Sequence, residues 1–250
     1  LWGMSLKQIG INDIARYELE QVIKKSPCNS INDANAYESL SNILIKENNY
    51  EQALKYTEQE RKIIADKGIS LMLDLDTFFD KEYHFLSHEQ KMDYINSHIE
   101  YLKGKLYYQK DEAEKGHTSF KRALEIYPGN LTILDEIADL VRENKFPQAE
   151  FKRLANMIMK YYQDKVEDNQ LPFYYYGLAE TYRLMGDKTD EGLALVKMAL
   201  LLEPGVLDCY ETLAGLYIQK KDFASAKLVI QTLINLKPQE KSYQELMKKL

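Results

Sequence analysis

The feature that most constrains this chain is a repeated pattern of tyrosine, small and apolar residues whose last two copies each close on a proline. The prolines that close the last two copies, Pro204 and Pro238, are 34 residues apart. One extra residue in the turn at 187–190 accounts for the 35 residues between Tyr175 and Tyr210. Self-similarity at such a period predicts a stack of small supersecondary units. The matched positions are Tyr175, Leu178, Ala179, Tyr182, Gly192, Val196 and Ala199 in one copy and Tyr210, Leu213, Ala214, Tyr217, Ala226, Ile230 and Leu233 in the other.

Less complete copies of the same pattern occur earlier in the chain. They place small, aromatic and apolar residues in the same order and end, where they are complete, on a proline. The matching residues are Gly104, Tyr107, Gly116, Phe120, Ala123 and Pro128 in the middle, Tyr37, Leu40, Ser41, Leu44 and Ala53 before them, and Trp2, Gly3, Leu6, Ala15, Leu19, Val22 and Pro27 at the start.

The pattern closely resembles the tetratricopeptide repeat, whose signature is W-x2-L-G-x2-Y, then A-x3-F, A and P over 34 residues. Tyr37, Tyr175 and Tyr210 replace the signature tryptophan. The resemblance implies an all-α, right-handed superhelical α-solenoid of about six helix pairs with a C-terminal capping helix. The implied units are a partial repeat at 1–28, repeats at 34–66, 97–129, 172–205 and 207–238, a lengthened repeat at 131–170, an irregular helix or degraded repeat at 68–96, and a cap at 239–250.

Small residues inside both helices of a pair have a physical reason. Two helices approach closely only where a small side chain lies at their crossing. Alanine alone could reflect helix propensity, but glycine costs about 1 kcal/mol in a helix interior. Gly104 and Gly116 therefore indicate positions where a neighbouring group leaves no room for a side chain.

Two stretches depart from the period. Pro128 and Pro204 are 76 residues apart, eight more than two repeats, so residues 131–170 are expected to form a longer pair with Pro147 at a helix start. Ser87 and Gln90 form a capping-box pattern, which predicts a long helix that runs to about Gln109. The chain begins inside a first helix, which suggests a fragment of a longer protein.

Composition excludes several classes of partner. The net charge is −6, whereas a protein that contacts phosphates usually carries a basic face, so nucleic acid is not expected. No apolar run approaches the roughly 18 residues that span a bilayer, so we expect no membrane insertion by this chain. Cys28 and Cys209 are 181 residues apart and require no disulfide, which favours a cytoplasmic location.

No residue pattern indicates catalysis, a cofactor or a metal. His84, His88 and Glu89 have a spacing that can hold a metal on one helix, but a helix that starts after Ser87 would separate them. No phosphate-binding glycine loop and no metalloprotease motif occurs. We therefore expect no catalytic, cofactor-binding or metal-binding residues and no enzyme activity.

The resemblance implies that first helices line a concave groove that holds a peptide or a partner protein. Chaperone-binding family members hold a carboxylate in a clamp that has a lysine where this chain has Glu38. Only the clamp asparagine is retained, at Asn42, which argues against such a clamp here. The groove residues expected from the register are His98, Tyr101, Lys105, Tyr108, Asp135, Asp139, Arg142, Phe173, Tyr176, Glu180, Arg183, Asp208, Glu211 and Gln219.

The sequence thus predicts a protein–protein interaction scaffold or adaptor. A second use of the same architecture remains open, in which the chain is the docking or sensing part of a larger enzyme or signalling or transcription regulator. Self-association is a further possibility, because a truncated first repeat would leave an apolar face uncovered.

Overall fold

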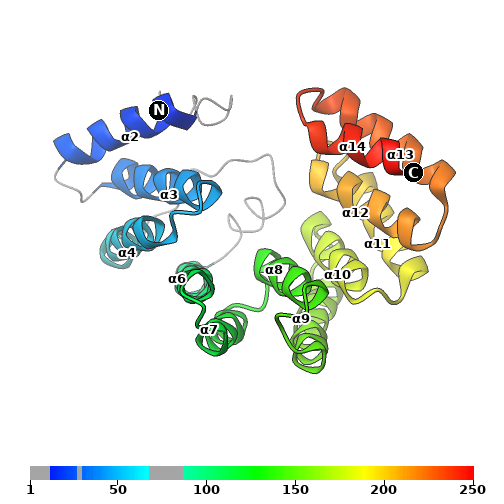
Figure 1. Ribbon diagram of the computed structural model, residues 1–250, viewed down its shortest axis with the longest axis horizontal. Helices are drawn as coiled ribbons and strands as arrows, with labels where there is room; N and C mark the ends of the chain where they lie inside the picture. The colour runs from blue at the N-terminus through cyan, green and yellow to red at the C-terminus, as the bar shows by residue number, and fades with distance from the viewer. Residues whose placement is uncertain (1–11, 27–29, 68–86) are drawn as a thin grey trace. The chain divides into compact units, whose positions relative to one another are not determined.

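The computed structural model describes residues 12–26, 30–67 and 87–250 of the chain. These residues form twelve α-helices and no strand (Figure 1). The all-α class predicted from the sequence is therefore confirmed. The helices are α2 (Asn12–Lys25), α3 (Ile31–Lys46), α4 (Tyr50–Lys67), α6 (His88–Gln109), α7 (Ala113–Ile126), α8 (Leu131–Arg142), α9 (Gln148–Asp168), α10 (Pro172–Met185), α11 (Thr189–Leu202), α12 (Leu207–Gln219), α13 (Phe223–Leu236) and α14 (Lys241–Lys249).

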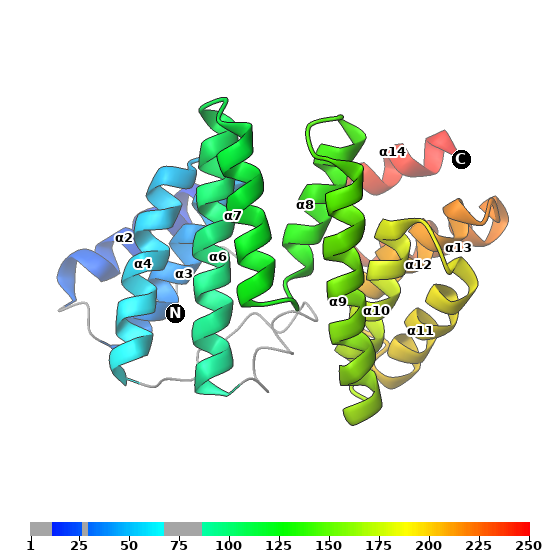
Figure 2. The same ribbon diagram turned by 90° about the horizontal axis from the view of Figure 1, so that it is seen from below.

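The helices group into two compact units. The first unit contains α2 to α7 and the first turn of α8. The second unit contains the rest of α8 and α9 to α14, because the boundary lies between Ile133 and Leu134. Within the units, helices pack as successive antiparallel pairs, α3 with α4, α6 with α7, α10 with α11 and α12 with α13. Figure 2 shows these pairs from the side, with α8 next to α9. The superhelical handedness stays a prediction.

The same backbone turn joins the two helices of five pairs. In each turn one residue adopts a left-handed conformation, and the next residue donates its N–H to the carbonyl five positions earlier, at 2.7–3.3 Å. This arrangement is the Schellman motif, which satisfies the free carbonyl groups at a helix end. The left-handed residues are Asn48, Asp111, Asn144, Gly186 and Lys221, and the accepting carbonyls belong to Leu44, Tyr107, Leu140, Tyr182 and Tyr217.

The turn between α10 and α11 contains the extra residue that the sequence predicts. Helix α11 begins at Thr189, seven residues after Tyr182, whereas α13 begins at Phe223, six residues after Tyr217. The additional residue is Lys188, which is itself left-handed with a φ of 47°. The predicted one-residue insertion is confirmed.

The interior glycines make room for aromatic rings. A Cβ atom on Gly116 would lie 2.7 Å from the ring of Tyr108, and one on Gly104 would lie 2.5 Å from Cδ1 of Phe120. The expectation that a neighbouring group excludes a side chain at these two positions is confirmed. The group is mainly an aromatic ring rather than a crossing backbone, the buried Phe120 at Gly104 and the half-buried Tyr108 at Gly116, although the Gly116 Cβ would also lie 3.3 Å from the Gly104 carbonyl oxygen.

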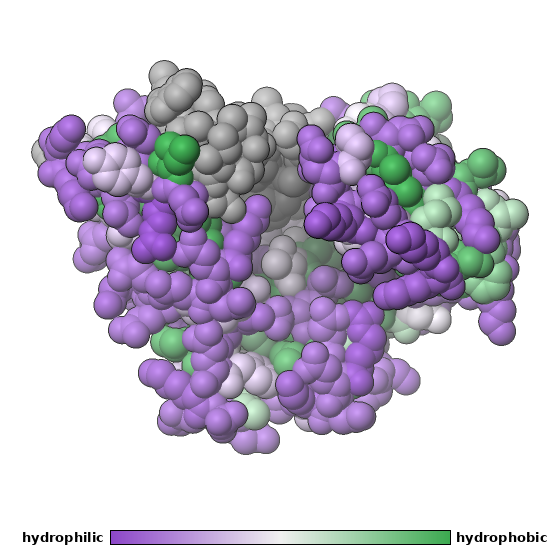
Figure 3. Space-filling model, turned by 45° about the horizontal axis from the view of Figure 1, so that its top comes forward, coloured by the Kyte–Doolittle hydropathy of each residue, from purple (hydrophilic) through white to green (hydrophobic). Residues whose placement is uncertain are grey.

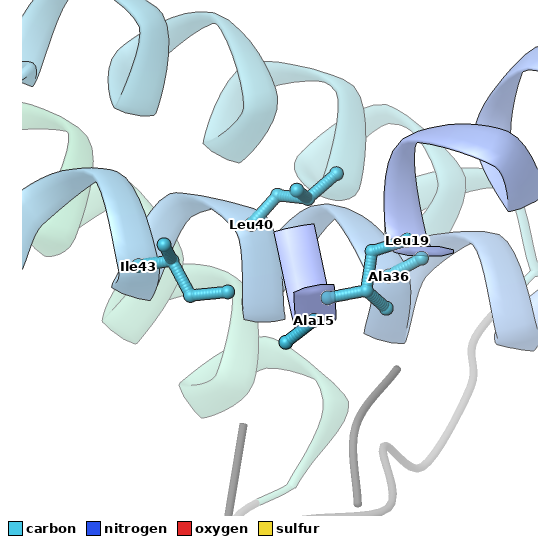
Figure 4. Close-up of a cluster of buried hydrophobic side chains, with 5 residues drawn as sticks. All are labelled: Ala15, Leu19, Ala36, Leu40 and Ile43. Carbon is cyan, nitrogen blue, oxygen red and sulfur yellow. The ribbon is translucent and has the colours of Figure 1, made fainter. Parts of the chain in front are cut away.

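Helix α2 packs on α3 through an apolar cluster. Figure 4 shows Ala15 and Leu19 of α2 against Ala36, Leu40 and Ile43 of α3, all at most 3% exposed. The small side chains of Ala15 and Ala36 let the two helices approach, as the pattern predicts for helix crossings. The first described helix therefore takes part in the same stacking as the later pairs.

Predicted helix starts are found where their capping residues lie. Ser87 Oγ accepts a hydrogen bond from the backbone N–H of Gln90, and the backbone N–H of Ser87 donates one to Oε1 of Gln90, so the capping box of the 22-residue α6 is confirmed. Pro147 directly precedes α9, as predicted. Residues 1–11, 27–29 and 68–86 lie outside the described residues, and with them lie most of the irregular segment at 68–96, His84, Pro27 and Cys28.

Candidate functional site

Arg183 joins the first helices of successive pairs in the second unit. From α10, its Nε and Nη2 donate to the two carboxylate oxygens of Glu180 at 2.7 and 2.5 Å. The same Nη2 lies 3.5 Å from the carboxylate of Asp135 on α8. A forked arginine–carboxylate contact of this kind is strong and fixes geometry as well as charge.

Helix α12 completes this connection. Thr212 donates its hydroxyl to Glu180 at 2.7 Å, and the side-chain amide of Gln219 donates to the Arg183 carbonyl at 2.6 Å. A Cβ atom on Gly215 would lie 2.7 Å from Cδ of Arg183, so the arginine stem runs directly against the α12 backbone. Arg183 and Glu180 of α10 thereby connect this helix with both α8 and α12, and Figure 1 shows α10 beside α12.

Burial and negative charge control the electrostatics of this cluster. Burial alone would lower the pKa of Arg183, but the hydrogen bond to Glu180 and the charges of Glu180 and Asp135 raise it above its ordinary value. Partial desolvation beside the neighbouring helices raises the pKa of Asp135, although its side chain stays 52% exposed, and the charge of Arg183 partly opposes this rise. Burial also raises the pKa of Tyr176, and the nearby charges of Glu180 and Asp208 add to the rise.

The residues predicted for a partner surface differ in exposure across the second unit. Glu180 and Phe173 are buried, at 7% and 3% exposed. Tyr176, Arg183 and Asp208 are half-buried. The exposed members are Asp135, Asp139 and Arg142 on α8, and Glu211 and Gln219 on α12.

Like Asp135, which lies near Arg183, the other two exposed carboxylates have partners within the chain. Asp139 forms an ion pair with Arg142 one turn along α8. Glu211 accepts a hydrogen bond from the hydroxyl of Tyr243, which lies on α14. The C-terminal helix α14 therefore continues the row of first helices, although none of its residues is fully buried.

The α6 residues predicted for the surface lie in a row of aromatic rings in the first unit. The ring of His98 contacts Tyr101 with the centroids 5.7 Å apart, and Tyr101 and Tyr108 each stack on Phe120 at 5.9 and 5.6 Å. Tyr101 is only 5% exposed as a result, and burial lowers the pKa of His98 to about 4. The ammonium of Lys105 lies 5.2 Å from the centre of the Tyr50 ring. As partner contacts these α6 residues stay predictions.

Two positions of the Arg183–Glu180 cluster were not found from the sequence. Thr212 binds the Glu180 carboxylate, and Gly215 accommodates the stem of Arg183. They follow Gly177 and Glu180 by 35 residues, the same offset that relates Tyr175 to Tyr210. Applied to Glu180, that offset leads to Gly215 on α12. Because glycine has no side chain, this position leaves room for the stem of Arg183.

The described residues contain no group of three or more His, Cys, Asp or Glu side chains that could hold a metal ion. In the part of the chain that the structure describes, no helix combines the length and apolarity that a membrane crossing requires. Cys209 is a buried free thiol, and burial, followed by the charges of Asp208 and Glu180, raises its pKa.

Apolar side chains are exposed at two places outside this cluster. On α2, Ile14, Tyr17 and Val22 are 50%, 60% and 41% exposed. In the second helices of the last two pairs, Leu201 and Leu228 are 76% and 74% exposed. Figure 3 shows apolar residues at the surface over these last helices. Self-association through the N-terminal repeat stays a prediction.

Comparison with known proteins places the last complete pair in a repeat family. The tetratricopeptide repeat matches residues 207–240, which hold α12 and α13. No curated protein sequence matches the chain. YrrB, described as a TPR protein with an unusual peptide-binding site, is 17% identical, with 93% of this chain and 98% of that chain covered and a TM-score of 0.37.

Two further solved structures show similar values. MamA 41-end from Desulfovibrio magneticus RS-1 is 14% identical, with 83% of this chain and 96% of that chain covered and a TM-score of 0.36. Yeast Tom70 is 17% identical, with 95% of this chain and 50% of that chain covered and a TM-score of 0.41. The last complete pair, α12 and α13, thus matches a tetratricopeptide repeat, and the same turn recurs in four earlier helix pairs, so this chain is an all-α helical repeat protein.

Proposed function

We propose that the chain is a non-catalytic interaction scaffold that binds a peptide or a partner protein on the first helices of its second unit. The surface in question, here called the α8–α10–α12 face, consists of Asp135, Asp139, Arg142, Tyr176, Glu180, Arg183, Asp208, Glu211 and Gln219. The observation that carries the proposal is the contact of Arg183 with all three helices.

A preformed polar surface favours binding because little has to be ordered when the partner arrives. Arg183 is held by Glu180, and Glu180 is held in turn by Thr212, so these side chains have already lost their rotamer freedom. The cost of immobilising such side chains is about 0.5–1.5 kcal/mol each when binding must supply it. Tyrosine and arginine are also the residue types that most often dominate binding energy at interfaces.

Capture of a partner from a lysate of the source cells tests this proposal. One variant changes three exposed side chains of the face, Asp139→Ala, Glu211→Ala and Gln219→Ala. We expect the native chain to retain a discrete protein that this variant loses, while the variant keeps the helical circular dichroism spectrum and cooperative unfolding of the native chain.

A matched control changes three exposed lysines on second helices, Lys152→Ala and Lys160→Ala on α9 and Lys227→Ala on α13. This control should retain the same protein as the native chain. Retention of the same protein by the face variant, or its loss from the control variant alone, would show that binding occurs elsewhere.

A further inference from the structure

Helix α11 is apolar on the side that faces solvent as well as on the side that faces the core. Between Gly192 and Leu202 it contains one charged residue, Lys197. Its buried residues, which include Val196 and Ala199, lie on the side that packs against α10 and α12. A helix that is apolar all round is typically covered all round. The outer side of α11 has no such cover among the described residues, since large apolar side chains are exposed there.

Four residues form one apolar stripe along this outer side, here called the α11 stripe. They are spaced at i, i+4, i+7 and i+8, which places them on one side of a helix. The members are Ala194, Met198, Leu201 and Leu202, of which the last three are 42%, 76% and 49% exposed. Lys197 lies at the edge of the stripe, and its ammonium is 5.5 Å from the centre of the Tyr217 ring on α12. The stripe itself therefore contains no charged residue.

The outer side of α13 differs from that of α11. Leu228 is 74% exposed, but the polar residues Lys227, Gln231 and Asn235 are exposed on the same side of the helix. A single leucine among polar residues is ordinary on a protein surface, whereas a continuous apolar patch marks an interaction site. Of these two second helices, α11 is thus the one whose surface a partner would cover.

The size and charge of the α11 stripe fit contact with a second copy of the same chain. Its exposed apolar area is on the order of 400 Å², within the range of the largest patch on a typical monomer. A specific interface needs at least about 600 Å² from each partner, and about 65% of a homodimer interface is apolar, or about 400 Å². A lipid surface fits less well, because membrane-surface helices are rich in lysine and arginine, whereas α11 carries Asp190, Glu191 and a single lysine.

We propose that two copies of the chain form a dimer in which their α11 stripes pack antiparallel about a two-fold axis at Met198. Leu202 of each copy then lies against Ala194 of the other, so a large side chain meets a small one on both sides of the axis. Glu191 is seven residues before Met198, so the two Glu191 side chains are about 20 Å apart, whereas parallel packing would place these like charges together. The dimer uses second helices and leaves the first helices of both copies free.

Sedimentation equilibrium of the full chain, over about 2–200 µM, tests this proposal. The interface lies at the lower end of the specific range, so we expect a dissociation constant in the micromolar range and a monomer at nanomolar concentrations. A chain that stays monomeric over the whole range would overturn the proposal.

Leu201→Glu should raise the dissociation constant of the dimer at least about tenfold, because it places a charge in an apolar contact. Leu201 is 76% exposed in the single chain, so the change leaves the core intact. The matched control is Leu228→Glu on α13, at a residue 74% exposed, which should stay within about twofold of the native chain. Equal weakening in both variants would overturn the proposal, since it would reveal a response to added charge alone.

A second pair of variants tests the antiparallel arrangement. Leu202→Glu alone should weaken the dimer, and adding Ala194→Lys to the same chain should restore it, because each new carboxylate then meets the new ammonium of the other copy. The two positions are eight residues apart on one helix, too far to pair within one copy. No restoration would overturn the antiparallel dimer. If Leu201→Glu loses the helical circular dichroism spectrum, this pair decides in its place.

Two further measurements distinguish other contacts. A dimer that Tyr17→Ser weakens and Leu201→Glu leaves unchanged would overturn the proposal by moving the contact to α2. Flotation with vesicles of phosphatidylcholine and phosphatidylserine tests a lipid surface as the cover. We expect the native chain to stay in the unbound fraction, and flotation of a monomeric native chain that Leu201→Glu abolishes would overturn the dimer.

Discussion

Replacing Gly177 by alanine tests whether close packing of rings against glycine holds the second unit together. A Cβ atom at this position would lie 2.6 Å from Cδ1 of Tyr162, and nearer still to Cε1 and Cζ of the same ring. Tyr162 is only 1% exposed, so its ring has little freedom to move away. Overpacking of this kind costs about 1–3 kcal/mol, and alanine returns about 1 kcal/mol of helix propensity.

Because three ring atoms are involved, we take the upper end of the cost and expect a net loss of about 2 kcal/mol. For a chain of this size the loss corresponds to a fall in Tm of about 4–8 °C. Thermal and urea unfolding followed by circular dichroism measure it. An unchanged or higher stability would refute the reasoning, since helix propensity would then outweigh the clash.

The control for this prediction is Gly205→Ala, which places the new methyl group where no atom lies within 4 Å. Its stability should stay the same or rise by up to about 1 kcal/mol. The combination of Gly177→Ala with Tyr162→Leu should cost less than the sum of the two single changes, because the smaller side chain makes room for the methyl group.

Ala226→Leu should cost about 1–3 kcal/mol in thermal unfolding, because Ala226 is fully buried; an unchanged melting curve would refute the repeat register. Arg183→Ala should cost about 2 kcal/mol by leaving the buried Glu180 carboxylate without its cation, and unchanged urea unfolding would show that the contact contributes little. Burial lowers the pKa of His98 from 6.5 to about 4, so between these pH values the unfolded chain binds more protons than the folded chain. The free energy of unfolding should therefore fall as the pH drops from 6.5 to 4, and it should fall less steeply in His98→Asn. If exposed apolar residues of α2 mediate self-association, sedimentation should show a concentration-dependent oligomer that Tyr17→Ser weakens, and a native chain that stays monomeric would end that idea.

The parts of the fold that could be predicted are those determined by local chemistry. Ser87 and Gln90 cap each other three residues apart, so their sequence pattern is sufficient to place the start of α6. Tyr182 and Tyr217 occupy the same position before a Schellman turn, so their recurrence in the sequence marks equivalent helix ends. These features depend on a few neighbouring residues, which a sequence states directly.

The depth of each predicted surface residue could not be obtained in this way. Helical periodicity places Tyr101 and Phe173 on the face of a first helix, but both are buried, at 5% and 3% exposed. Tyr101 is covered because its ring stacks near Phe120 of the partner helix α7, and Phe173 lies against Tyr174 with the ring centres 4.4 Å apart. Such contacts depend on ring orientations in three dimensions, which periodicity does not specify.

The most direct test of the central claim is photo-crosslinking in a lysate of the source cells. A photoreactive phenylalanine analogue replaces Gln219, exposed on the α8–α10–α12 face, or Lys197, exposed on the second helix α11. If the first helices bind the partner, the probe at Gln219 forms a discrete covalent adduct and the probe at Lys197 forms none. An adduct from Lys197 alone, equal adducts from both positions, or no adduct from either would contradict the assignment of this face as the binding surface.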